Sequence, residues 1–239
     1  MILHLVALKA TKYSDTQTIL TAYSRELGRV SFALPAGKGK GAARAKALCM
    51  SLGIVECMSE PRAGREILPL RQLSQSVALS SLHSDPVKQM MAMFLAEVLA
   101  VTLQGGEPDA ALFDFLVGAI RCLDNADAAR TANFHICFLF NLSRHLGIEP
   151  DASTFTEGSI LDLADGRWRQ TMPLHRRFLP PKESAVAMLL SRMTFANMHR
   201  FRFNRTERNA IIDAMLEYYS IHYVSMRSLK SLDILRSML

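Results

Sequence analysis

Cysteine is scarce in this chain, with four residues among 239. Cys49, Cys57, Cys122 and Cys137 form no C-x-x-C pair, and no closely spaced histidines accompany them. A tetrahedral zinc site needs paired ligands at short spacing, so we expect no metal site, and nothing else in the sequence indicates a cofactor. The four thiols are instead expected to be reduced and mostly buried, as is typical of a protein from a reducing compartment.

Long apolar runs are also missing. No uncharged apolar stretch reaches about 18 residues, the length that a membrane-spanning helix requires. The apolar residues 1–8 are followed directly by Lys9 and Lys12 and have no small-residue cleavage site, so they predict a strand and not a signal peptide. We therefore expect a cytoplasmic protein without a membrane partner.

Catalytic motifs are absent as well. The sequence contains no G-x-S-x-G, H-E-x-x-H or G-x-G-x-x-G pattern. Asp162 and Asp165 flank a predicted turn, where aspartate is common for structural reasons. His135 and His145 lie on a mostly apolar predicted helix, which favours core or interface positions. No nucleophile is paired with a base, so we predict that the chain has no catalytic residues and that the protein is not an enzyme.

Acidic residues are few in the first 82 residues, which hold 11 Lys and Arg against 5 Asp and Glu. Residues 83–239 hold 17 of each kind, so the whole surplus of positive charge lies in the first third. A basic part joined to a neutral part suggests a platform for a polyanion and a separate part that binds partners.

The first third also has the sequence pattern of strands. Five segments are rich in β-branched, aliphatic and aromatic residues, namely 1–9, 16–25, 29–34, 49–57 and 67–73. Gly28 permits a hairpin turn between the second and the third segment. Five short strands of this kind fit a five-stranded OB-fold barrel, the commonest small barrel among nucleic-acid-binding proteins.

From residue 83 the apolar period becomes that of helices. Asp85-Pro86 is a helix-start signal, with proline in the first turn. Helices are expected over 87–103, 109–123, 128–146, 182–195, 206–224 and 228–239. Asp165-Gly166 lies between two short apolar runs and predicts a β-hairpin within residues 151–180. We therefore expect an α+β multidomain chain with an OB-fold domain at 1–82 and an all-helical domain at 83–239 that carries a small β-hairpin insertion.

The stretch 35–47, PAGKGKGAARAKA, alternates glycine with cationic residues. Glycine lets a backbone approach phosphates closely, and Lys and Arg displace their counterions. A Walker A loop is excluded because no Lys-Ser/Thr pair follows at its spacing. We expect a mobile loop with a helical turn at 42–47. A solvated hairpin tip without a ligand is the alternative interpretation, and we favour a loop that contacts phosphates. The candidate DNA-binding residues are Lys9, Lys12, Arg25, Arg29, Lys38, Lys40, Arg44 and Lys46.

Aromatic residues are rare in the same third, which holds only Tyr13, Tyr23 and Phe32. Tyr13 lies in a predicted turn and can be exposed, whereas Phe32 alternates with apolar residues and is expected in the core. Bases on single strands bind by stacking on aromatic rings. With so few rings available, we expect binding to follow the sugar–phosphate backbone and to tolerate any sequence.

A second basic cluster, in residues 192–208, is interleaved with Phe195, Phe201 and Phe203. Arginine matches carboxylates and an apolar groove accepts an aromatic ring, so an acidic peptide with an aromatic tip is one candidate ligand. A second nucleic-acid surface, or buried phenylalanines beside solvated arginines, fits the pattern equally well. The candidate peptide-binding residues are Arg192, Arg200, Arg202, Arg205 and Arg208.

Four stretches, taken in order, resemble the RecO family of bacterial recombination mediators: LKATKYSDTQTILTAYSRELGRVSFALPAGKG, FNLSRHLGIEPD, LDLADGRW and FNRTERNAIIDAMLEYYSIHYVSMRSLKSLDILRSML. The last stretch is similar to Bacteroidetes-type members. The resemblance implies an N-terminal OB-fold, a helical C-terminal domain, binding to single- and double-stranded DNA, and annealing of complementary strands. It also implies partnership with RecR and with the acidic C-terminal tail of single-stranded-DNA-binding protein. Through these partners a RecO protein would help RecA to load on DNA that this binding protein covers.

One departure from the family concerns its zinc ribbon, which many members build from four cysteines just after the L-G-x-x-P stretch. Residues 151–170 contain no cysteine here, and Cys137 precedes the stretch. The hairpin is therefore expected to keep the shape of the ribbon without metal. The leading interpretation is a nucleoid-associated, non-catalytic DNA repair and recombination mediator. The alternative is an adaptor whose main ligand is an acidic peptide tail, with DNA binding secondary.

Overall fold

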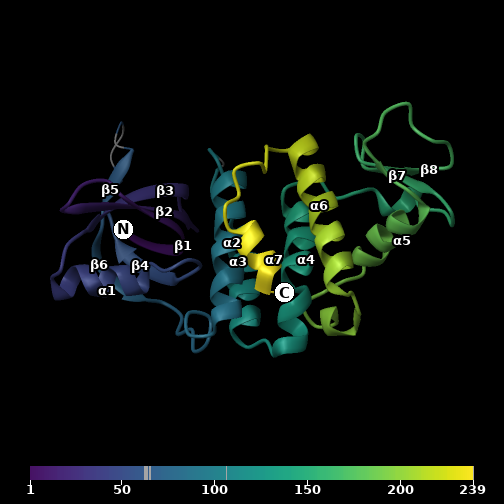
Figure 1. Cartoon of the computed structure of the whole chain (residues 1–239). Coiled ribbons are helices and arrows are strands. Elements are labelled where there is room, and N and C mark those ends of the chain that lie inside the picture. Colours follow the sequence, from purple (N-terminus) through teal and green to yellow (C-terminus); the bar gives the residue numbers. More distant parts are fainter. Residues whose placement is uncertain (62–63, 65, 106, 239) are drawn as a thin grey trace. The chain divides into compact units, whose positions relative to one another are not determined.

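The computed structural model describes residues 1–61, 64, 66–105 and 107–238 (Figure 1). These residues form two compact units, one of residues 1–125 and 229–238 and the other of residues 126–228. The first unit extends beyond residue 82 because helices that follow it pack against the strands. The predicted domain bounds, 1–82 and 83–239, stay a prediction. None of the helices described is long and apolar enough to cross a membrane.

A curled six-stranded sheet opens the first unit and confirms the predicted OB-fold class. Its strands, in the order β5-β3-β2-β1-β4-β6 across the sheet, are β1 (Ile2–Lys12), β2 (Gln17–Ser24), β3 (Gly28–Pro35), β4 (Ile54–Met58), β5 (Ile67–Pro69) and β6 (Arg71–Gln75). β5 pairs parallel with β3, and β6 pairs antiparallel with β4. The predicted single strand at 67–73 is thus two strands, divided at Leu70, because this one segment supplies both edges of the curled sheet.

The β2–β3 hairpin has the predicted turn. Ser24 pairs with Gly28 at one end and Gln17 with Pro35 at the other, and Gly28 has φ +67°. Glycine adopts this left-handed conformation without the steric cost that a Cβ would bring. Phe32 is fully buried in the core of the sheet, as its alternation with apolar residues predicted.

Helix α1 (Lys40–Leu48) follows β3 and is longer than the predicted helical turn. The strand predicted at 49–57 begins only at Ile54, because residues 49–53 end the helix and turn the chain. Leu52 has φ +61°, and a Cβ added to Gly53 would lie 2.4 Å from the carbonyl oxygen of Leu48. This close backbone approach explains why a glycine occupies the turn.

Three helices complete the first unit: α2 (Pro86–Thr102), α3 (Ala110–Asp124) and α7 (Leu232–Met238). Asp85 caps α2 through the N–H groups of Val87 and Lys88, which agrees with the predicted Asp-Pro start. The Glu97 carboxylate accepts bonds from the backbone N–H and the hydroxyl of Ser231, at 2.9 and 2.5 Å, and so ties α2 to the start of α7. The predicted tail helix begins at 232 instead of 228, and Leu239 lies outside the described residues.

Asp124, at the end of α3, fixes the segment that follows the sheet. Its carboxylate accepts the N–H groups of Ser80, Ser81 and Leu82 at 2.9, 2.8 and 2.7 Å. The buried Lys88 ammonium donates to the Asp124 carbonyl oxygen at 2.7 Å and to the Ser81 hydroxyl at 2.8 Å. Burial alone would raise the pKa of Asp124, but the hydrogen bonds lower it below its usual value.

The second unit packs three helices, α4 (Ala128–His145), α5 (Pro181–Leu190) and α6 (Arg205–His222), with a three-stranded sheet of order β8-β7-β9. Its strands are β7 (Ile160–Asp162), β8 (Arg167–Arg169) and β9 (Phe178–Leu179), and two 3-10 turns span Ala152–Thr154 and Met198–Arg200. The helix predicted at 182–195 ends at Leu190. Thr194 and Asn197 then bond each other's backbone N–H through their side chains and form a turn.

The predicted hairpin insertion is present as β7 and β8. Trp168 is buried among Leu161, Leu163 and Tyr218, and its indole N–H donates to the carbonyl oxygen of Ser184 at 3.2 Å. Gly166 forms the turn with φ +71°, where a Cβ would lie 2.5 Å from the Tyr218 hydroxyl oxygen. A packed apolar core therefore holds this hairpin in place.

Asp124→Asn tests the bonds at the end of α3. Replacing a buried acceptor that three N–H groups share leaves part of them unpaired, so we expect the free energy of unfolding to fall by about 2–4 kcal/mol. Because the folded pKa of Asp124 is lowered, its stabilising contribution is present at neutral pH and is lost as the pH falls below about 4.

Urea unfolding at pH 7 and at pH 3 measures both effects. The exposed Asp15→Asn serves as the matched control and should shift neither curve. A free energy of unfolding for Asp124→Asn within about 0.5 kcal/mol of the unmodified protein at pH 7 would contradict the importance of these bonds.

Candidate nucleic-acid interface

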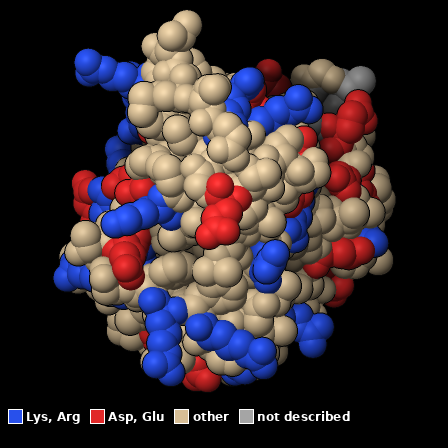
Figure 2. Space-filling model, turned by 90° about the vertical axis from the view of Figure 1, so that its right-hand side faces the viewer, with Lys and Arg blue, Asp and Glu red and all other residues tan. Residues whose placement is uncertain are grey.

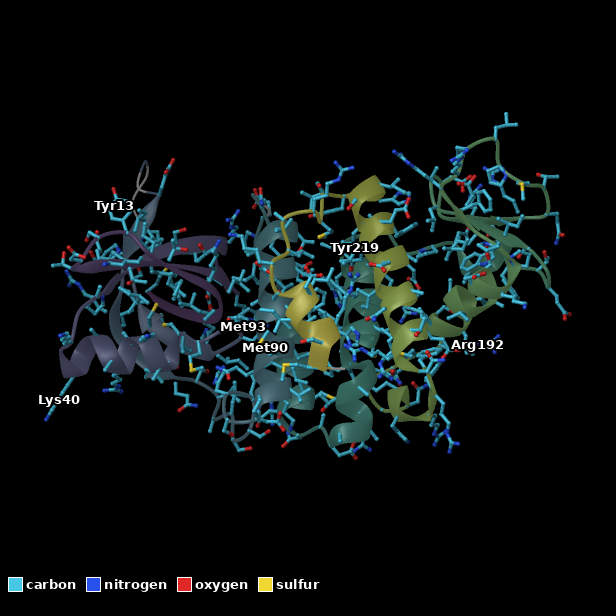
Figure 3. The ribbon with its side chains drawn as sticks, in the orientation of Figure 1. Tyr13, Lys40, Met90, Met93, Arg192 and Tyr219 are labelled. Carbon is cyan, nitrogen blue, oxygen red and sulfur yellow. The ribbon has the colours of Figure 1, made fainter. Side chains whose placement is uncertain are left out.

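Four of the predicted DNA-binding cations gather in the basic segment, residues 38–46. Lys38 lies in the turn before α1, and Lys40, Arg44 and Lys46 lie on the helix; all four are exposed. Within the described residues none of them forms an ion pair with a carboxylate. Lys40 points away from the sheet into solvent (Figure 3).

The local sequence explains why these cations face outward. Ala45 is buried on one side of α1, which packs against β3 and β6. Lys40 and Arg44 are one helical turn apart and so share a face, where like charges repel each other. An anion bound between such cations would remove the repulsion. No acidic residue occupies the first turn of α1 to offset this charge.

The glycines make the backbone of the same segment accessible. A Cβ added at Gly37, Gly39 or Gly41 would meet no atom within 4 Å. Gly37 has φ +116°, a conformation that L side chains rarely adopt. Open backbone beside unpaired cations is the arrangement that phosphate groups can approach closely.

An exposed aromatic ring lies at the same end of the sheet. The Ala36 N–H donates to the Thr16 carbonyl oxygen at 2.9 Å, so the residues just before the basic segment lie beside the turn between β1 and β2. This turn carries Tyr13, which is 69% exposed and projects from the sheet (Figure 3). Lys12 lies next to it and pairs with Asp15 at 2.7 Å. The turn therefore offers a ring on which a base can stack.

Arg25 and Arg29 lie at the opposite end of the β2–β3 hairpin. The Arg25 guanidinium donates to both carboxylate oxygens of Asp114 on α3 and lies 5.8 Å from the centroid of the Phe113 ring. Arg29 is exposed and is separated from Pro35 by most of β3, about 20 Å at the usual rise of a strand. The eight predicted residues therefore do not form one continuous surface.

Lys9 is exposed on β1 and lies within electrostatic range of Glu97 on α2. Burial would raise the pKa of Glu97, but hydrogen bonds from Ser231, with a smaller contribution from Lys9, lower it. Of the eight predicted DNA-binding residues, Lys9, Lys12 and Arg25 thus have acidic neighbours. The basic segment holds most of the remaining ones.

The predicted peptide-binding arginines lie in the second unit. Arg192, Arg200, Arg202 and Arg205 are exposed, whereas Arg208 is half-buried and donates to the Phe203 carbonyl oxygen at 2.5 Å. Figure 3 labels Arg192, which follows α5. Phe195 stacks on Phe134 with ring centroids 5.1 Å apart, so at least this phenylalanine of the cluster packs against α4.

Sequence reasoning did not find the apolar pocket of the second unit. It has a volume of about 370 Å³ and lies between α4, α5, α6 and β7. Its lining includes Phe140, Leu161, Leu190, Phe203, Ile211 and Met215, with Lys182 among the few charged side chains. The apolar face of α6 is visible in the sequence as helical spacing, but periodicity cannot show that part of such a face stays uncovered.

Comparison with known proteins identifies the family. A family model described as "Recombination protein O C terminal" matches residues 83–233. The protein named DNA repair protein RecO from Porphyromonas gingivalis strain W83 is 36% identical over 239 residues, which cover 98% of this chain and 96% of that protein. The proteins of the same name from Phocaeicola vulgatus and Bacteroides fragilis strain YCH46 are 34% and 31% identical, with the same coverage.

The chain belongs to the RecO family. Membership confirms the resemblance to Bacteroidetes-type members and supports a role in DNA repair. The β7–β8 hairpin of this RecO-family chain contains no cysteine, and its correspondence to the family's zinc ribbon stays a prediction. Cys49 and Cys57 are buried thiols, and burial raises the pKa of Cys49 to about 12 and that of Cys57 to about 11. Both thiols therefore stay protonated at neutral pH and are poor nucleophiles.

Proposed function

We propose that this protein is a non-catalytic mediator of DNA repair by homologous recombination, which binds single- and double-stranded DNA and anneals complementary strands. The observation that supports this function best is the basic segment. Its four exposed cations have no carboxylate partner in the part of the chain that the structure describes, and they stand on open, glycine-rich backbone. Membership of the RecO family supports the repair role.

The proposed mechanism is neutralisation of charge. Lys38, Lys40, Arg44 and Lys46 hold phosphates and release their counterions, which weakens the repulsion between two DNA strands. Tyr13, in the β1–β2 turn at the same end of the sheet, offers a separate stacking surface. The protein supplies no base-specific contact, and pairing between the strands supplies the specificity.

Within the cell we place this function in the cytoplasm, at the nucleoid. The proposed partners are RecR and the acidic C-terminal tail of single-stranded-DNA-binding protein, and RecA is affected indirectly through its loading on DNA. These proposals rest on membership of the family, which the match over residues 83–233 and the identities over nearly the whole chain support.

Replacing Lys38, Lys40, Arg44 and Lys46 together by Ala should slow strand annealing at least tenfold, because strand repulsion is then no longer offset. The measurement is the annealing rate of complementary labelled oligonucleotides at low salt. All four side chains are exposed, so the free energy of unfolding should stay nearly unchanged.

The matched control removes four other exposed cations, Arg121, Lys182, Arg227 and Lys230. It lowers the net charge equally and should slow annealing much less. Equal slowing in the two variants would assign annealing to net charge alone and would contradict a local interface on the basic segment.

A second candidate function is supported by the apolar pocket. Phe203 lines this pocket and belongs to the basic cluster 192–208, so an acidic peptide can place an aromatic side chain in the pocket while its carboxylates face Arg200 and Arg202. This would make the protein an adaptor for an acidic tail, and the two functions are compatible.

A fluorescent peptide with acidic residues and a C-terminal phenylalanine tests this candidate on the full chain. Ala210 lines the pocket but is exposed, so Ala210→Trp should narrow the pocket without disturbing the core. We expect this variant, and Arg200→Ala with Arg202→Ala, each to weaken peptide binding roughly tenfold. Unchanged affinity in both variants would rule out this site.

A further inference from the structure

The loop between β8 and β9, residues 170–177, exposes large apolar side chains. Met172 is 68% exposed, and Leu174 is the most exposed large apolar side chain of the described residues, with its full surface in solvent. In Figure 1 the loop extends beyond β7 and β8. Figure 2, which views this end of the molecule, shows an uncharged projection at the top with Lys and Arg side chains to either side.

The base of the loop is fixed even though its tip is exposed. The buried Asp162 carboxylate lies 3.4 Å from Nε of Arg169 on the outgoing side and 3.3 Å from Nε2 of His175 on the returning side. The Leu163 N–H also donates to the Arg177 carbonyl oxygen at 3.0 Å. These contacts hold both sides of the loop on the hairpin, so that Met172 and Leu174 are presented on an anchored support.

Charge around the tip is mainly positive. Arg167 pairs with Asp151 at 3.6 Å, and Arg169 with Asp162 and Asp165. Arg176 and Arg177 are exposed, and neither forms an ion pair with a carboxylate among the residues that the structure places. In the sequence the two apolar residues are followed, after His175, by two exposed arginines that form no ion pair among the described residues, and guanidinium groups suit a polyanion.

We propose that this loop is a wedge for duplex DNA, which inserts Met172 and Leu174 between base steps while Arg176 and Arg177 hold the neighbouring phosphates. Proteins that bend DNA commonly insert apolar side chains in this way and unstack the bases locally. The proposed function supplies the ligand, DNA, and the wedge adds a second contact on the second unit with a different mode of binding.

The size of the tip favours bases over other ligands. Two large apolar side chains separated by Pro173 are enough to enter one base step, because the rest of the contact is made with phosphates. Stable binding to a membrane surface needs a larger apolar face, and a stable protein interface needs about 800 Å² on each partner.

Duplex DNA that contains 2-aminopurine tests the wedge, because this base becomes brighter when it is unstacked. We expect the full chain to increase the fluorescence of the saturated duplex. Met172→Ser with Leu174→Ser should abolish the increase and leave affinity for single-stranded DNA unchanged. Arg176→Ala with Arg177→Ala should weaken duplex binding roughly tenfold at low salt. All four side chains are exposed, so these variants should fold normally.

The wedge is refuted if the protein binds the duplex without brightening it, or if the double serine variant brightens it as the unmodified protein does. Binding to anionic phospholipid vesicles that is lost in the double serine variant would assign the loop to membranes and would also refute it. Failure of the proposed function is distinguishable: it would appear as unchanged annealing in the basic-segment variant, which retains the loop.

Discussion

The order of the first unit depends on the hydrogen bonds that the Asp124 carboxylate accepts. A negative charge at the C-terminal end of α3 meets the negative end of the helix dipole, and burial adds a further cost. Three backbone N–H groups from residues 80–82 offset this cost, and the buried ammonium of Lys88 joins the same cluster. The residues that follow the last strand are thereby bound to α2 and α3, and the sheet is joined to helices within one compact unit.

This connection also decides which cations of the sheet stay available. At the end of the β2–β3 hairpin that meets α3, Arg25 is engaged by Asp114 and Phe113. Lys9 lies near Glu97, the carboxylate that holds Ser231 before α7. Lys9 and Arg25, which lie near the helices α2 and α3, thus have acidic neighbours, whereas the cations of the basic segment form no ion pair with any carboxylate that the structure describes. Unpaired positive charge is concentrated where the glycine-rich backbone is open.

Local pattern predicted most of the elements. Segments rich in β-branched, aliphatic and aromatic residues predicted the strands of the sheet. Gly28 and Gly166 predicted two turns, and Asp85-Pro86 predicted the start of α2. One error came from distant contacts, because the segment 67–75 divides to pair with both edges of the sheet. Another was local, because β4 starts late where the chain turns tightly at Gly53 against Leu48.

The candidate site was less predictable for the same reason. Charge counts located the basic segment, but the partner of Arg25 is 89 residues away in the sequence. The two ends of the β2–β3 hairpin could not be told apart without knowing which one meets α3. The pocket of the second unit was missed because packing between helices, and not periodicity, leaves a face uncovered.

A salt titration of single-stranded DNA binding tests most directly whether the basic segment holds phosphates. Each phosphate contact on a single strand contributes about 0.7 to the slope of log affinity against log salt concentration. If all four cations make contacts, the variant that lacks Lys38, Lys40, Arg44 and Lys46 should have a slope shallower by roughly 3 than that of the unmodified protein. The same slope in both proteins would show that DNA is bound elsewhere.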